Sequence, residues 1–210
     1  MERSPLPDAR QARALVDVAA GRTAADLRLR GAHVLDPFLG GARPADVLIV
    51  DRWVAAVVPP DADAWPAGRS EVRLDGGLLS PGLIDGHMHL ESSLVSPARY
   101  AETVLPRGVT AVVCDPHEVA NVAGVPGVRW LLARAAGLPF DVIATVPSCV
   151  PSTRLETPGA ELGRDEIEAL LADDGVVGLA ELMSFPAVVA GDPDTLAKAD
   201  AAQRAAGVVE

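Results

Sequence analysis

The stretch Pro81-Gly82-Leu83-Ile84-Asp85-Gly86-His87-Met88-His89 leads from a turn into a short apolar strand that ends in two histidines. Side chains alternate between the two faces of a strand, so His87 and His89 are expected on the same face. Two neutral imidazoles that share a face can bind one divalent metal ion. Histidines at this spacing also occur at solvated strand edges, but the turn and the apolar lead-in favour a metal site.

From Ser80 onward, strand-like and helix-like segments alternate along the chain. The expected strands cover residues 83–89, 109–114, 141–146 and 176–181, and a fifth opens at 208–210. Helices are expected after the first four strands, at 97–105, 125–136, 164–172 and 193–207. This order predicts an α/β fold, the first half of a (β/α)8 TIM-type barrel. A complete barrel takes about 250 residues, so the sequence is expected to be truncated; a smaller open α/β sheet is the alternative.

The first part of the chain lacks this alternation. A short amphipathic helix is expected at 8–20, and strand-like runs follow at 26–35, 45–50, 53–58 and 71–74 without helices between them. Several short strands in succession predict part of a small β-sandwich. We therefore expect two domains: residues 1–79 with the helix and the partial sandwich, and residues 80–210 with the first four βα units.

Composition narrows the classes of partner. The 210 residues are 49% hydrophobic and carry a formal net charge of −11, which argues against nucleic acid or an anionic membrane because both attract basic surfaces. No apolar run approaches the ~20 residues of a membrane span, and the N-terminus lacks the apolar core of a signal peptide. Cys114 and Cys149 lie in apolar runs, as expected for reduced thiols in a cytoplasmic protein.

Polar side chains gather where the expected strands end, which is where (β/α)8 barrels carry their reactive groups. These positions include three of the four histidines in the chain. The polar residues at the four strand ends are His87, His89, Asp115, His117, Glu118, Ser148, Cys149 and Glu181. A lone glutamate at a strand end is often only exposed. Beside two histidines, however, Glu181 is favoured as the anionic bridge that a binuclear metal centre needs.

The segment Asp115-Pro116-His117-Glu118 has two interpretations. Asp before Pro is a common helix start, with Pro in the first helical position and acidic residues in the first turn. That interpretation explains Asp115 and Glu118 but leaves His117 without a role. The other interpretation gives at least one of these side chains a part in proton transfer or metal binding.

The motif Pro-Gly-x-Ile-Asp-x-His-x-His at residues 81–89 resembles the first-strand signature of the amidohydrolase superfamily. These metal-dependent hydrolases are built on a (β/α)8 barrel flanked by a small β-sandwich. Three further motifs resemble the adenine deaminase family within it: Leu90-Glu91-Ser92-Ser93, Asp115-Pro116-His117-Glu118-Val119-Ala120-Asn121 and Pro147-Ser148-Cys149-Val150-Pro151. The resemblance extends from Ala24 to the last residue.

The resemblance implies hydrolytic deamination of adenine to hypoxanthine and ammonia by a metal-activated water, a step of purine salvage. It implies a binuclear divalent metal centre, with Mn²⁺ or Fe²⁺ favoured and Zn²⁺ as the alternative. The implied metal ligands are His87, His89, Glu181 and His117, and the implied proton-transfer groups are Asp115 and Glu118. Many amidohydrolases bridge their metals with a carboxylated lysine, but Lys198, the only lysine, lies in the last expected helix. The implied partners are a small purine substrate and, in a full-length protein, further copies of the same chain in a homo-oligomer.

Other functions are weighed against this one. Another amidohydrolase, such as an amino-sugar deacetylase or a cyclic amidase, would share the first-strand motif but not the later ones. A zinc deaminase of the cytidine type would need a P-C-x-x-C ligand pair that the sequence lacks. A third alternative is an inactive fragment that needs its C-terminal half, because the later ligands of the superfamily would lie beyond this chain. Ser92 and Ser93 either orient a substrate or cap the next helix, and Cys149 is interpreted as structural.

Overall fold

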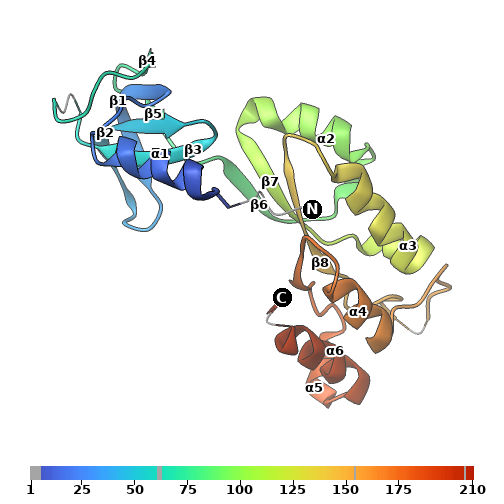
Figure 1. Cartoon of the computed structure of the whole chain (residues 1–210). Coiled ribbons are helices and arrows are strands. Elements are labelled where there is room, and N and C mark those ends of the chain that lie inside the picture. The colour runs from blue at the N-terminus through green and yellow to red at the C-terminus, as the bar shows by residue number, and fades with distance from the viewer. Residues whose placement is uncertain (1–5, 61–62, 154, 206) are drawn as a thin grey trace. The chain divides into compact units, whose positions relative to one another are not determined.

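The computed structural model describes residues 6–60, 63–153, 155–205 and 207–210. The chain divides into two compact units, Ser4–Pro81 and Gly82–Glu210, each with its own sheet (Figure 1). Among the described residues, no helix combines the length and the apolar character needed to span a membrane.

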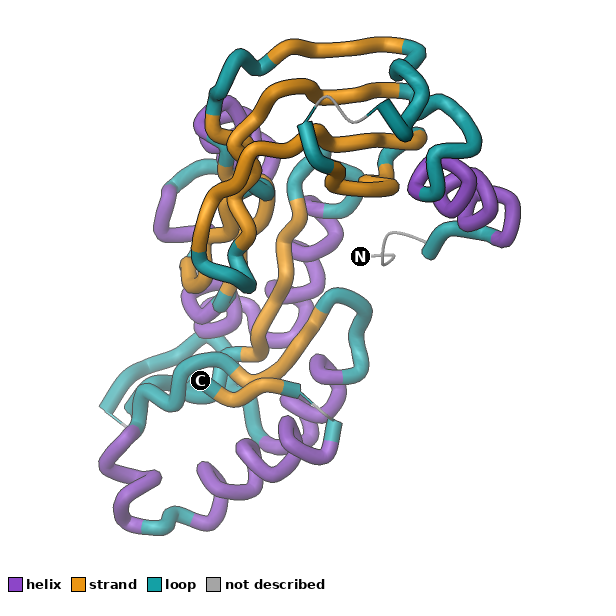
Figure 2. The backbone as a smooth tube through the Cα atoms, turned by 90° about the vertical axis from the view of Figure 1, so that its left-hand side faces the viewer, coloured by secondary structure: helices purple, strands orange, loops and turns teal. Residues whose placement is uncertain are grey.

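The N-terminal unit is a five-stranded sheet with one helix. Strands β1 (Leu27–Asp36), β2 (Gly41–Val50) and β3 (Trp53–Val58) are antiparallel neighbours, and β4 (Ser70–Arg73) and β5 (Leu78–Leu79) each pair in parallel with β1. The strands run alongside one another in Figure 2. Helix α1 (Ala9–Ala19) starts with a capping box between Asp8 and Gln11. The four expected strands are present within a few residues of their predicted bounds.

A buried ion pair joins the first two strands of this unit. The Nε and Nη2 atoms of Arg28 donate to Oδ2 of Asp46 at 2.9 and 2.7 Å. The other oxygen, Oδ1, accepts from the N–H of Gly31 at 2.8 Å, where β1 is bulged and the glycine has φ 69°. Both charges are therefore neutralised and hydrogen-bonded, which is the condition under which buried charges are tolerated.

The C-terminal unit is a parallel five-stranded sheet. Its strands are β6 (Leu83–Met88), β7 (Val109–Cys114), β8 (Asp141–Val146), β9 (Val176–Leu179) and β10 (Val208–Val209). Each strand pairs with the next one in the sequence, giving the order β10-β9-β8-β7-β6. A doubly wound open sheet reverses its strand order part-way through, whereas a barrel adds strands in sequence order. The arrangement confirms the half of a (β/α)8 barrel.

Helices follow the strands and cover them. Helices α2 (Pro97–Val104) and α3 (His117–Ala135) pack Tyr100 and Leu131 against Val112 of β7, and the two helices lie beside each other in Figure 1. Helices α4 (Arg164–Leu171) and α6 (Pro193–Arg204) pack on β8 and β9 around a second core. Short 3₁₀ turns η1 (Leu90–Ser93) and η2 (Leu105–Arg107) flank α2.

Two helical segments differ from the sequence-based expectation. Helix α3 starts eight residues before the expected residue 125, with a break at Gly124, where φ is 59° and ψ −149°. The expected segment is therefore only the part after this break, since Gly124 and Pro126 mask the continuity in the sequence. Helix α5 (Phe185–Ala190) was not expected, because a six-residue helix with a proline in its first turn has too short a pattern to show periodicity.

Candidate metal centre

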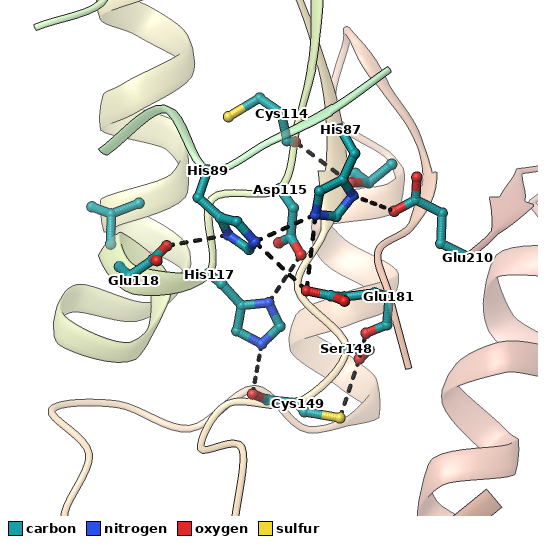
Figure 3. A network of polar contacts seen from close by, with 12 residues as sticks. His87, His89, Cys114, Asp115, His117, Glu118, Ser148, Cys149, Glu181 and Glu210 are labelled. Carbon is teal, nitrogen blue, oxygen red and sulfur yellow. Dashed lines mark hydrogen bonds and ion pairs between the residues drawn. The ribbon is translucent and has the colours of Figure 1, made fainter. Parts of the chain in front are cut away.

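His87 and His89 lie at the end of β6 and face one another, as their spacing predicts (Figure 3). Their Nε2 atoms are 3.4 Å apart. The outer nitrogen of each ring faces a carboxylate: Nδ1 of His87 lies 3.2 Å from Oε2 of Glu210, and Nδ1 of His89 lies 3.2 Å from Oε2 of Glu118. The His87 contact has hydrogen-bond geometry, whereas Nδ1 of His89 makes no hydrogen bond among the described residues. With hydrogen on Nδ1, each ring leaves its Nε2 lone pair free on the side where the two rings face each other.

Glu181, two residues beyond the end of β9, completes a triangle with these nitrogens. Its Oε1 lies 3.6 Å from Nε2 of His89 and 3.9 Å from Nε2 of His87. Two imidazole lone pairs and a carboxylate oxygen repel one another unless a cation lies between them. Ligands that sit about 2.1 Å from one tetrahedral ion lie about 3.4 Å apart, close to the separations seen here. The residues present therefore fit a divalent metal ion.

Asp115, directly after β7, is the fourth member of this group. One ligand atom from each of His87, His89, Asp115 and Glu181 lies within 4.8 Å of all the others. Asp115 is fully buried, and its Oδ1 has no hydrogen-bond partner among the described residues. A buried carboxylate oxygen without a partner is costly, and a cation would satisfy it. The structure thus places Asp115, expected as a proton-transfer group, among the potential ligands.

His117 lies beside the group but turns both ring nitrogens away from it. Nδ1 is 3.0 Å from Oδ2 of Asp115, and Nε2 is 2.8 Å from the carbonyl oxygen of Cys149. Both partners only accept, so the ring donates from both nitrogens and is positively charged. Burial alone would lower the pKa of His117, but the hydrogen bond to Asp115, the charge of that carboxylate and the Cys149 carbonyl raise it above its ordinary value. In this arrangement no nitrogen of His117 is available to a metal ion, and its role as a ligand stays a prediction.

Glu118 connects the first turn of α3 to the strand end. Its Oε1 accepts from the Ser92 hydroxyl at 2.8 Å, while Oε2 faces His89. Burial raises the pKa of Glu118, but hydrogen bonds from the Ser92 hydroxyl and from the backbone outweigh it and the net shift is downward. Glu118 is therefore ionised near neutral pH. Neither Ser92 nor Ser93 caps α2, because Ser96 does so.

Ser148 and Cys149 support the site from the end of β8. The Ser148 hydroxyl donates to the backbone carbonyl of Glu181 at 2.5 Å, and the Cys149 carbonyl accepts from His117. Both cysteines are free and buried, and burial raises the pKa of the Cys114 thiol to about 12. The Cys114 thiol is thus unreactive at neutral pH, and Cys149 stays interpreted as structural.

Sequence reasoning missed Glu210. Its carboxylate contacts Nδ1 of His87, and its backbone N–H donates to the carbonyl of Leu179 at 3.2 Å. The signal was present, since Glu210 follows an apolar strand in the same way as Glu181 does. It was overlooked because the strand before it has only two residues.

A cavity of about 440 Å³ opens beside the ligand group. Its walls include His89, His117, Glu118, Glu181, Asn121 and Met183. This volume lies within the range of about 300–1,000 Å³ that is usual for small-molecule sites. A larger cavity of about 590 Å³ lies between the loop after β8 and α6. It contains none of the four ligand residues, so the smaller cavity is the candidate substrate site.

Comparisons with known proteins agree with this geometry. The Amidohydrolase family model matches residues 78–208. The chain is 45% identical over 189 residues to an adenine deaminase of Desulfatibacillum aliphaticivorans, covering 90% of this chain and 32% of the relative. It is 45% identical over 184 residues to an adenine deaminase of Methanothrix thermoacetophila, covering 88% of this chain and 31% of the relative. The chain thus spans about a third of the length of these curated relatives.

Solved structures share the fold. A crystal structure of D-aminoacylase superposes with a TM-score of 0.60 at 24% identity, covering 88% of this chain and 44% of that chain. The N-acyl-D-glutamate deacylase of Bordetella bronchiseptica superposes with a TM-score of 0.58 at 21% identity, covering 89% of this chain and 44% of that chain. Because the family model covers more than half of the 210 residues, this chain belongs to the amidohydrolase family.

Proposed function

We propose that this chain carries the metal-binding side of an adenine deaminase active site, in which adenine and water give hypoxanthine and ammonia. The observation that carries the proposal is the group of His87, His89, Asp115 and Glu181 at the ends of three parallel strands. The choice of adenine as the substrate is supported by the adenine deaminases that are 40–46% identical to this chain. Because these relatives are longer than this chain, we assign the whole reaction to a longer polypeptide.

The ligand set favours a particular kind of metal. Imidazole and carboxylate ligands suit Mn²⁺, Fe²⁺ and Zn²⁺, and we propose a binuclear centre with manganese or iron, with zinc as the alternative. Such an ion supplies the chemistry by lowering the pKa of water so that hydroxide is available near neutrality. Glu181 fits the bridging place, because its Oε1 faces both histidines.

Two further side chains, Glu118 and His117, are assigned to proton transfer and to charge compensation. Deamination breaks the bond between C6 and the amino nitrogen and forms a C6–O bond, so a proton from water must reach the ring or the departing amino group. Glu118 is ionised, lines the cavity and lies next to His89, so we assign it the transfer of this proton. His117 holds its charge against Asp115 and orients that carboxylate.

The test uses the complete gene product, purified and loaded with manganese or iron. We expect ammonia release from adenine, and no release of acetate from an N-acetylated amino sugar or ring opening of a cyclic amide. Metal content before and after chelation shows whether activity follows the ion. Turnover of an acylated or cyclic amide substrate without turnover of adenine would assign the chain to another branch of the family.

A further inference from the structure

The chain contains two Asp-Pro pairs directly before helices, and the two pairs behave differently. Before α6, Oδ2 of Asp192 accepts from the N–H of Thr195, three residues later, at 2.9 Å. This is the usual way in which an aspartate caps a helix. Before α3, Asp115 and Glu118 have the spacing of a capping box, the arrangement that Asp8 and Gln11 form at α1. Helix α3 nevertheless begins at His117 without a cap from its own segment.

Each polar group of the unused capping box at α3 has another partner. The backbone N–H of Asp115 donates to the carbonyl of Met88 at 2.9 Å, so Glu118 does not reach back to it. The Glu118 carboxylate is bound by Ser92 instead. The Asp115 side chain binds His117 and joins the potential metal ligands (Figure 3).

The cap of α3 comes from a different element. The N–H of Val119, in the first turn of the helix, donates to Oε1 of Glu91 at 3.0 Å. Glu91 belongs to η1 and lies two residues after His89. One short segment therefore presents His89 to the metal group, Glu91 to the helix and Ser92 to Glu118.

We propose that Glu91 is a positioning residue that caps α3 in place of Asp115 and so leaves the Asp115 carboxylate available as a metal ligand. Without this cap, the local preference of Asp-Pro-His-Glu would turn the Asp115 side chain toward its own helix, as happens at Asp192. Local sequence rules are expected to fail at functional sites, and here the residue that overrides the rule can be named. The inference rests on the metal-binding part of the proposed function and is independent of the substrate.

A purely structural role for Glu91 predicts a different effect of its loss on metal affinity. If Glu91 only stabilised α3, its loss would lower the free energy of unfolding and leave metal affinity unchanged. If it acts through Asp115, its loss lowers metal affinity, and only while Asp115 is present. The two roles are therefore separated by metal binding in single and double variants.

The experiment measures Co²⁺ binding to the 210-residue chain by titration of the visible absorption bands, with unfolding in urea as a check on folding. Glu91→Asp keeps the charge but is one methylene too short to reach Val119, whereas Glu91→Gln keeps the length and an acceptor oxygen. We expect Glu91→Asp to weaken Co²⁺ binding by about 10-fold, the lower end of the effect of outer partners of metal ligands, with a changed spectrum. Glu91→Gln should bind as the parent does, and Glu102→Gln, on the exposed face of α2, is the matched control.

The double variant Glu91→Asp/Asp115→Asn decides the route. It should bind Co²⁺ as weakly as Asp115→Asn alone. Parent-like affinity of Glu91→Asp, an equal loss in Glu91→Gln, or additive losses in the double variant would each overturn the proposal. If Glu91→Asp does not fold, Glu91→Met, which has the length without the acceptor, takes its place with the same expectations. A parent chain that binds no Co²⁺ would overturn the proposed function as well.

Discussion

At the scale of single residues, the site concentrates carboxylates around two histidines. Four carboxylates, those of Asp115, Glu118, Glu181 and Glu210, surround the imidazoles of His87 and His89, and His117 supplies one positive charge. Like charges this close raise the free energy of the folded chain. One or two divalent ions would reverse the sign of that interaction, so we expect metal binding to stabilise the folded chain.

Glu181 is the carboxylate whose charge matters most to the metal. Glu181→Gln keeps the shape of the side chain but removes the charge that faces both Nε2 atoms. Loss of a side chain that hydrogen-bonds to a metal ligand lowers metal affinity by about 10–100-fold. We expect Glu181→Gln to lower it by at least as much, because Glu181 would be a ligand itself. Metal retained after dialysis, measured by elemental analysis, tests this. Glu156→Gln, which changes a carboxylate on the wall of the same cavity, should retain its metal; equal retention by both variants would exclude Glu181 as a ligand.

At the scale of elements, the sequence predicted the parts whose signals are local. The strand runs and the shared face of His87 and His89 follow from the two-residue period of a strand. The orientation of Asp115 could not be predicted, because its local pattern indicates a cap and the competing partner, Glu91, comes from another element. The contact between Nε2 of His117 and the Cys149 carbonyl, 32 residues away, could not be predicted from a local pattern either. The expected role of His117 as a metal ligand came from the resemblance and stays a prediction.

Close packing of β9 against β10 depends on Gly178. A methyl group added at Gly178 would collide with the carbonyl oxygen of Val208 and lie 2.6 Å from its nitrogen. Gly178→Ala should therefore displace β10 and cost about 1–3 kcal/mol in the free energy of unfolding, as overpacking does. Urea denaturation measures it. Gly41→Ala, which meets nothing within 4 Å, should be close to neutral, and similar losses for both would contradict the packing argument.

The buried pair of Arg28 and Asp46 should dominate the stability of the N-terminal sheet. Asp46→Ala leaves the guanidinium without its partner in the core, and removing one member of a buried pair costs about 3–5 kcal/mol. The exposed pair of Arg69 and Asp26 gives the comparison, because Arg69→Ala should cost less than about 1 kcal/mol. Equal shifts in the urea midpoint would show that water reaches Asp46.

At the scale of the whole molecule, the ligand group is open to solvent on the side of His87 and Glu181. The side chains of His87 and Glu181 are 39% and 45% exposed, and among the described residues both edge strands of the parallel sheet carry exposed apolar side chains, including Leu83, Ile84 and Val208. Electrostatic stabilisation of a reaction requires a site from which water is excluded. We therefore expect the described chain to bind the metal but not to exclude water from a substrate.

We accordingly expect a polypeptide of residues 1–210 to bind a divalent ion but not to deaminate adenine. The four ligand atoms already lie within 4.8 Å of one another, so residues 1–210 are sufficient to form the metal site. A purine, by contrast, must be contacted from more than one side to be held in position for reaction. Calorimetric titration with Mn²⁺ and a coupled assay for ammonia, run on the same preparation, measure the two properties separately. The Glu181→Gln variant gives the background signal for both the Mn²⁺ titration and the ammonia assay. Ammonia release near the about 1–10³ s⁻¹ of ordinary enzymes would show that the open half-barrel already holds everything the reaction requires.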